Sequence, residues 1–183
     1  MKQKNSTIQG IHNRPILVDV CYSGNKNKKP LVIFCHGYKG YKDWGAFDLM
    51  TDVFLDNELV LVKFNFSHNG GTIENPIDFP DLEAFGQNNY TKEQDDLNSV
   101  IDWVLSNKEY AEDIDATNIT LIGHSRGGGA VILKAGYDSR ITNLVTWASV
   151  SDYKSRFPQG PVLEYWKKEG VAYIENARTL QQM

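Results

Sequence analysis

The stretch Ile119-Thr120-Leu121-Ile122-Gly123-His124-Ser125-Arg126-Gly127-Gly128-Gly129 decides the fold of this 183-residue chain. An apolar run leads directly into a Gly-x-Ser-x-Gly motif, and a helix-like run at 130–135 follows it. This order predicts a buried strand, a sharp turn that carries Ser125, and a helix. A side chain at Gly123 or Gly127 would collide with neighbouring backbone in such a turn. The motif predicts a nucleophilic Ser125; the alternative is a serine that only caps the helix.

Apolar runs and helical patterns alternate along the rest of the chain. Strands are predicted at 15–22, 31–35, 59–66 and 144–148. A helix after Thr91 begins with the form of a capping box and places its apolar residues on one stripe. That stripe consists of Leu97, Val100, Ile101, Val104 and Leu105. A shorter helix, capped by Asp43, carries Phe47 and Met50. The alternation predicts an α/β protein with a mostly parallel sheet and helices on both faces.

Composition and charge exclude several classes of function. The chain is 41% hydrophobic and 23% charged, as is ordinary for a soluble globular protein. Its net charge of -4 does not indicate the basic surface that nucleic-acid binding requires. With neither a signal peptide nor a membrane-spanning run, a cytoplasmic protein is predicted. Cys21 and Cys35 lie in strand-like runs and are predicted to be buried thiols. No zinc-ligand spacing, phosphate loop or dinucleotide fingerprint is present, so no metal or cofactor is predicted.

A second segment completes a constellation with Ser125. His36-Gly37-Tyr38 follows the run at 31–34 immediately. A strand that ends in His-Gly can turn backbone N–H groups toward a nucleophile, so an oxyanion hole made by the amides of Tyr38 and Arg126 is predicted. Residues 65–71 end the next strand at the same carboxyl edge, where ligands bind. Candidates for the pocket are His68, Phe85 and Trp166, although aromatic side chains also pack loops onto a core.

The chain resembles the α/β-hydrolase superfamily, within its dienelactone-hydrolase-like and cinnamoyl-esterase-like serine hydrolases. The resemblance rests on His36-Gly37-Tyr38, on the strand end at 64–70 and on the motif at 123–128, and it covers about residues 7–183. It implies that Ser125 is the nucleophile and that the Tyr38 and Arg126 amides are the oxyanion donors. It also implies a sheet of eight strands, with the catalytic acid after the seventh and the histidine after the eighth.

No histidine follows Ser125, although the order in this fold is serine, acid, histidine. Residues 1–150 are therefore expected to form the N-terminal part of the hydrolase core, with its C-terminal strands missing and its acid and histidine beyond Met183. Residues 151–183 are expected to form a lid- or cap-like segment with a helix at 160–170 and a strand at 171–174. A base at His68 would depart from that order. Pairing with the missing fragment or with another copy is expected.

The predicted function is hydrolysis of a small carboxylic ester or related acyl substrate through an acyl-enzyme on Ser125. This chain alone is expected to be inactive, because it lacks the histidine that would act as base. The alternative is a truncated or degenerate hydrolase-like domain that binds a ligand or partner without turnover. Within the enzyme class, acyl transfer and peptide cleavage remain open.

Overall fold

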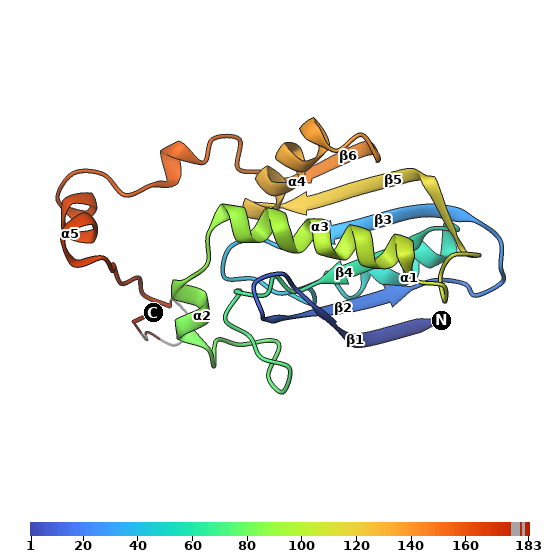
Figure 1. The fold of residues 1–183 in the computed structure, drawn as a ribbon, viewed down its shortest axis with the longest axis horizontal. Helices are drawn as coiled ribbons and strands as arrows, with labels where there is room; N and C mark the ends of the chain where they lie inside the picture. The colour runs from blue at the N-terminus through green and yellow to red at the C-terminus, as the bar shows by residue number, and fades with distance from the viewer. Residues whose placement is uncertain (177–179, 181) are drawn as a thin grey trace. The chain divides into compact units, whose positions relative to one another are not determined.

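The computed structural model describes residues 1–176, 180, 182 and 183, and the chain divides into two compact units, Met1–Val150 and Ser151–Met183. The first unit contains a sheet made of β1 (Lys2–Gln9), β2 (Pro15–Cys21), β3 (Lys29–Cys35), β4 (Val60–Phe64), β5 (Ile114–His124) and β6 (Ile141–Trp147). Its helices are α1 (Met50–Asp56), α2 (Leu82–Gly86), α3 (Tyr90–Ser106) and α4 (Arg126–Tyr137) (Figure 1). The second unit carries a 3-10 turn, Lys154–Arg156, and α5 (Pro161–Glu169).

The six strands lie in the order β1-β2-β4-β3-β5-β6. Strands β4, β3, β5 and β6 pair in parallel, whereas β1 pairs antiparallel with β2, and β2 pairs antiparallel with β4. The prediction of a mostly parallel sheet is confirmed. Strand β1 was not predicted, because Ile8 is its only buried residue and its place comes from pairing with β2.

Each face of the sheet has its own apolar cluster. On one face, Leu97, Val100 and Ile101 of α3 and Val131 of α4 pack with alternate residues of the strands. Figure 1 shows α3 running along this face. On the other face, side chains from α1 and the segment before it pack on Cys21, Val32, Phe34, Leu61 and Ile122. Helices therefore cover both faces, as predicted, and both cysteines are buried free thiols.

Three local predictions are wrong. Helix α1 begins at Met50, with Leu49 at its N-cap, so Asp43 does not cap it; the Asp43 carboxylate binds Lys42 and Lys63. Helix α3 begins at Tyr90, and the Asn89 side chain accepts from the Lys92 amide at 2.9 Å, so Thr91 is not the cap. The helix predicted at 160–170 is present as α5, but residues 171–174 form no strand; in the described residues beside them only an isolated bridge joins Glu175 to Gln182.

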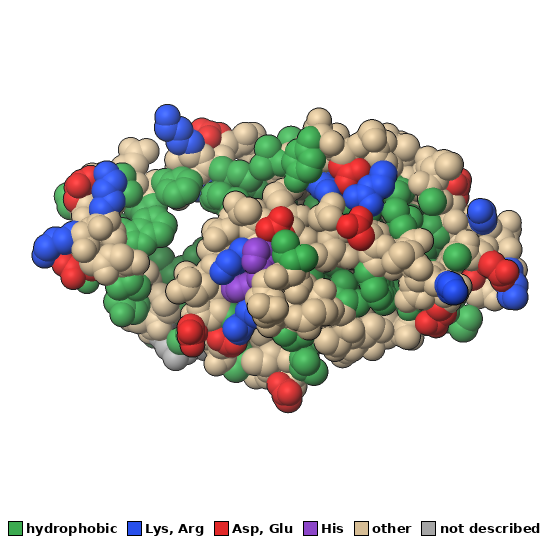
Figure 2. All heavy atoms as spheres, in the orientation of Figure 1, with side chains coloured by type: hydrophobic (Ala, Val, Ile, Leu, Met, Phe, Trp, Pro, Cys, Tyr) green, Lys and Arg blue, Asp and Glu red, His purple; other side chains and the backbone are tan. Residues whose placement is uncertain are grey.

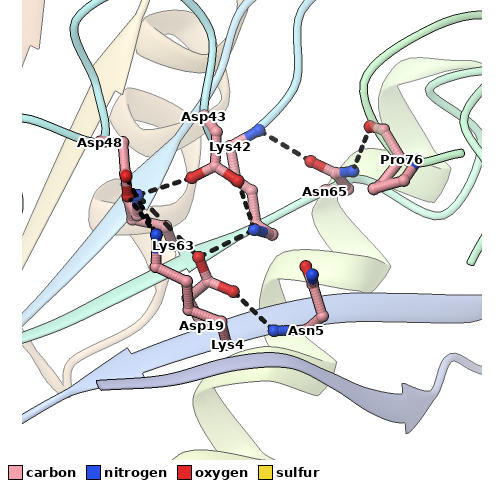
Figure 3. A network of polar contacts seen from close by, with 9 residues as sticks. All are labelled: Lys4, Asn5, Asp19, Lys42, Asp43, Asp48, Lys63, Asn65 and Pro76. Carbon is pink, nitrogen blue, oxygen red and sulfur yellow. Dashed lines mark hydrogen bonds and ion pairs between the residues drawn. The ribbon is translucent and has the colours of Figure 1, made fainter. Parts of the chain in front are cut away.

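A buried ionic cluster joins the loop after β3 to strands β2 and β4 (Figure 3). The Lys42 ammonium donates to Asp19 at 2.8 Å, and the Lys63 ammonium donates to Asp43 at 2.7 Å and to Asp48 at 2.9 Å. The side chains of Asp19 and Lys63 are fully buried. Buried charges are retained only when they are paired, so the cluster fixes the segment from Lys42 to Asp48 against the sheet.

Strand β6 ends the sheet in the part of the chain that the structure describes. Figure 2 shows hydrophobic side chains at the surface near α4. The exposed hydrophobic side chains of β6 are Leu144, Val145 and Trp147. A strand edge with exposed apolar side chains is a template for pairing with another chain.

We therefore expect the 183-residue chain to self-associate as its concentration rises, and Val145→Lys to weaken this association because an edge lysine opposes strand pairing. Sedimentation velocity over a concentration series measures both effects. A monodisperse monomer at every concentration, with a cooperative melt, would contradict the expectation.

Candidate active site

Ser125 lies at the sharp turn between β5 and α4, with φ 53° and ψ -116°, a conformation that non-glycine residues rarely adopt. Hydrogen bonds hold this backbone from both sides. The Ser125 amide donates to the Trp147 carbonyl at 2.9 Å, and the Ser125 carbonyl accepts from the amides of Val150 and Gly128 at 2.9 and 3.0 Å. The Ser125 side chain makes no capping hydrogen bond with the helix. The geometry therefore does not support the reading of Ser125 as a helix cap.

Glycines allow the segments around Ser125 to touch. A Cβ on Gly123 would lie 2.3 Å from the Gly127 carbonyl oxygen, and a Cβ on Gly127 would lie 2.3 Å from the His36 carbonyl oxygen. The predicted collisions with backbone are confirmed. A Cβ on Gly37 would lie 3.0 Å from Cβ of Ser125. The loop after β3 is thus packed directly on the turn that carries Ser125.

His36 fixes the start of that loop. Its Nε2 accepts from the Phe66 amide at 3.2 Å, so its Nδ1 carries the proton and donates to the Gly37 carbonyl at 2.8 Å. Burial lowers the pKa of His36 to about 4, which keeps the ring neutral. Among the described residues the Tyr38 amide makes no hydrogen bond. The role of the Tyr38 and Arg126 amides as oxyanion donors stays a prediction.

Side chains from three segments meet beside Ser125. The Arg126 guanidinium lies 5.4 Å from the Tyr38 ring and 4.3 Å from the Tyr90 ring, and its Nε donates to the Glu93 carboxylate at 2.9 Å. Phe85, a predicted pocket residue, has its ring 5.6 Å from that of Tyr38. Sequence reasoning missed Glu93, because the motif that contains it was interpreted as a capping box.

His68 belongs to a different cluster. Its Nδ1 lies 2.8 Å from Oγ of Ser67, and Ser67 also donates from its amide and its hydroxyl to Asp96, each at 2.8 Å. The His12 ring lies 6.0 Å from the His68 ring. Among the described residues no contact joins His68 to Ser125. Trp166 lies on α5 in the second unit, where its ring stacks on that of Phe157 at 6.4 Å.

This cluster gives an expectation for stability against pH. Burial raises the pKa of Asp96 to about 6, from 3.8, so the folded chain binds more protons than the unfolded chain between these values. Asp96 therefore makes the chain less stable as the pH rises through this window. Relative to the unchanged chain, Asp96→Asn is expected to be about 2 kcal/mol more stable at about pH 7.5 than at about pH 4.5, as measured by urea unfolding.

For His68 the expected pH dependence of stability has the opposite sign, and the same measurement tests it. Burial lowers its pKa to about 4, so the unfolded chain binds the extra proton as the pH falls below 6.5. His68→Gln is therefore expected to gain relative stability at the acidic pH. Equal pH profiles for the unchanged chain and both variants would contradict this account of the cluster.

A cavity of about 280 Å³ opens next to this cluster. Its walls include Arg14, Asn65, Ser67, Asn69 and Asp81. Asn65 and Asn69 already bond to the loop after β3: Oδ1 of Asn65 accepts from the Lys42 amide at 2.7 Å, and Nδ2 of Asn69 donates to the Gly40 carbonyl at 3.2 Å. These two asparagines therefore hold that loop rather than offering free groups to a ligand. Ser125 does not line the cavity.

Neither a protein-family model nor a curated protein sequence matches this chain. Solved structures do, and they show that it has the α/β-hydrolase fold. The α/β hydrolase GrgF from Penicillium sp. sh18 superposes with a TM-score of 0.69 at 14% identity, over 97% of this chain. For the dienelactone hydrolase from Anabaena variabilis ATCC 29413 the TM-score is 0.61 at 15% identity, over 81% of this chain.

The esterase EaEST from Exiguobacterium antarcticum superposes with a TM-score of 0.59 at 20% identity, over 91% of this chain. All three proteins are longer, because the match covers 60% of GrgF, 63% of the dienelactone hydrolase and 57% of EaEST. The predicted resemblance is confirmed for the fold. In the described residues no helix has the length and apolarity needed to cross a membrane.

Proposed function

We propose that this chain carries the nucleophile and the oxyanion hole of a serine hydrolase that acts on carboxylic esters or related acyl substrates. The observation that carries the proposal is the strained backbone of Ser125 between β5 and α4, with the 36–38 loop packed on it. Strain of this kind persists only where the surroundings impose it, and it clusters at active sites.

In the proposed reaction, Oγ of Ser125 attacks the carbonyl carbon, and its proton passes to a base. The carbonyl oxygen gains the negative charge, and the amides of Tyr38 and Arg126 stabilise it. Collapse of this intermediate expels the alcohol, which takes the proton, and leaves an acyl group on Ser125. Water then releases the acid by the same steps.

The test is covalent labelling of the 183-residue chain with an alkyl fluorophosphonate in the presence of imidazole, which supplies the base, followed by peptide mass spectrometry. The reagent forms a phosphorus–oxygen bond to an activated serine and expels fluoride. We expect one adduct, on the peptide that contains Ser125, and none in Ser125→Ala. Ser139→Ala, which changes an exposed serine just after α4, is the matched control and should label like the unchanged chain. Label spread over other residues, or equal label in Ser125→Ala, would overturn the proposal.

The base is tested separately with added imidazole. Because no histidine follows Ser125, ester hydrolysis by this chain should stay within ~10³–10⁴-fold of the reaction in water, the level that remains when a triad member is removed. Imidazole should speed labelling of Ser125 in the unchanged chain. Fast turnover without imidazole that disappears in Ser125→Ala would show that a histidine of this chain acts as base, and His68→Gln would then identify it.

A further inference from the structure

The side chain of Arg126 links the two residues whose amides form the proposed oxyanion hole. Arg126 is the first residue of α4, and its guanidinium lies within cation–π distance of Tyr38, on the loop after β3. The second ring, Tyr90, belongs to the first turn of α3. The guanidinium, carried by α4, thus contacts two other segments, the loop after β3 and α3.

Glu93 sets the direction of this guanidinium. Its carboxylate accepts from Nε of Arg126 at 2.9 Å and from Nδ2 of Asn88, also at 2.9 Å. The Glu93 side chain is only 5% exposed and that of Arg126 only 16%, so little solvent screens the pair. An arginine held by a buried carboxylate keeps its plane fixed, which a lysine could not reproduce.

Tyr38 has few other restraints. Its side chain is half exposed, and its ring lies against Phe85, the guanidinium and, at 5.8 Å, the ammonium of the adjacent Lys39. The amide of Tyr38 must lie within hydrogen-bond distance of the developing oxyanion, and small displacements of such donors are costly in rate. A side-chain contact from Arg126, the residue that supplies the other amide, is well placed to set this distance.

We propose that Arg126 is a positioning residue: in cation–π contact with Tyr38 and Tyr90 and held by Glu93, its side chain fixes the Tyr38 amide opposite its own amide. The proposal rests on the proposed function of Ser125. It predicts that Arg126 acts on catalysis through Tyr38, and not through stability or charge alone.

The experiment measures the rate constant for phosphonylation of Ser125 in the full chain, with imidazole present, by intact-mass spectrometry. Arg126→Met is expected to lower this rate about tenfold, less than the 10²–10³-fold loss of a whole oxyanion donor. Arg126→Lys, which keeps the charge but not the planar stack, should also lower it. Arg140→Met is the matched control, because Arg140 is also ion-paired but lies beyond the far end of α4, and the rate should be unchanged.

A double-mutant cycle separates positioning from a structural role. Tyr38→Leu keeps the amide and removes the ring, so Arg126→Met should have little further effect in that background. In Tyr90→Leu, Arg126→Met should still slow labelling. Independent effects of Arg126→Met and Tyr38→Leu, or equal rates in Arg126→Met and the unchanged chain, would overturn this proposal alone. Absence of label on Ser125 in the unchanged chain would overturn the proposed function and this proposal with it.

Discussion

Lys63→Met is expected to lower the free energy of unfolding by about 3–5 kcal/mol, because removing one partner of a buried ion pair leaves the other charge uncompensated. The fully buried Lys63 ammonium binds both Asp43 and Asp48, and it lies 3.9 Å from a carboxylate oxygen of Asp19. Methionine fills most of the volume, so the loss reports on charge. Urea unfolding followed by circular dichroism measures it.

The matched control is Lys26→Met, which removes an exposed ion pair with Glu112 and should leave the unfolding midpoint unchanged. A second check uses acid. Hydrogen bonds from Lys63 and Lys4 lower the pKa of Asp48 to about 2, so its contribution is present above its ordinary value of 3.8 and is lost as the pH falls toward 2. The difference between the unchanged chain and Lys63→Met should therefore shrink in that range. A constant difference would contradict the assignment.

Gly127→Ala is expected to lower the free energy of unfolding by about 3 kcal/mol, at the upper end for overpacking, and to abolish labelling of Ser125. The new Cβ would lie 2.3 Å from the carbonyl oxygen of His36 and 2.5 Å from that of Cys35. Both are backbone atoms, so the clash can be relieved only by separating α4 from the end of β3. That separation also moves the 36–38 loop away from Ser125.

Gly136→Ala in the same helix is the control, because a Cβ there meets nothing within 4 Å. Alanine should raise the free energy of unfolding by roughly 0.5–1 kcal/mol at this helical position. Thermal melts and fluorophosphonate labelling of both variants complete the comparison. Full labelling of Gly127→Ala would show that Ser125 does not depend on the contact between α4 and the end of β3.

The central strands were predictable because a strand buried on both faces is a continuous apolar run. Leu31 to Cys35 has this form, and Val60 to Phe64 has it except at Lys63; both became buried strands. Strand β1 lacks it, since its residues are mostly polar and exposed, and only hydrogen bonds to β2 define it. Asp43 was read as a helix cap because a local pattern cannot show that Lys63, twenty positions later, takes its carboxylate.

In the candidate site too, some features have a local sequence signal and others do not. The glycines beside Ser125 carry a local signal, because a tight turn allows no other residue there. The pairing of Arg126 with Glu93 spans 33 positions, and it forms only when α3 packs beside α4. Buried lysines such as Lys42 and Lys63 have no local signature either, since lysine is almost never fully buried unless it is paired.

The two buried cysteines determine how the thiol reactivity of the chain differs between its folded and unfolded states. Burial raises the pKa of Cys21 and, well above its usual range, that of Cys35, so neither thiol supplies the thiolate that alkylating reagents require. In the native chain, therefore, neither cysteine competes as a nucleophile for an added electrophile. The same thiols become reactive once the sheet opens, and their alkylation by a maleimide thus counts the molecules that have unfolded.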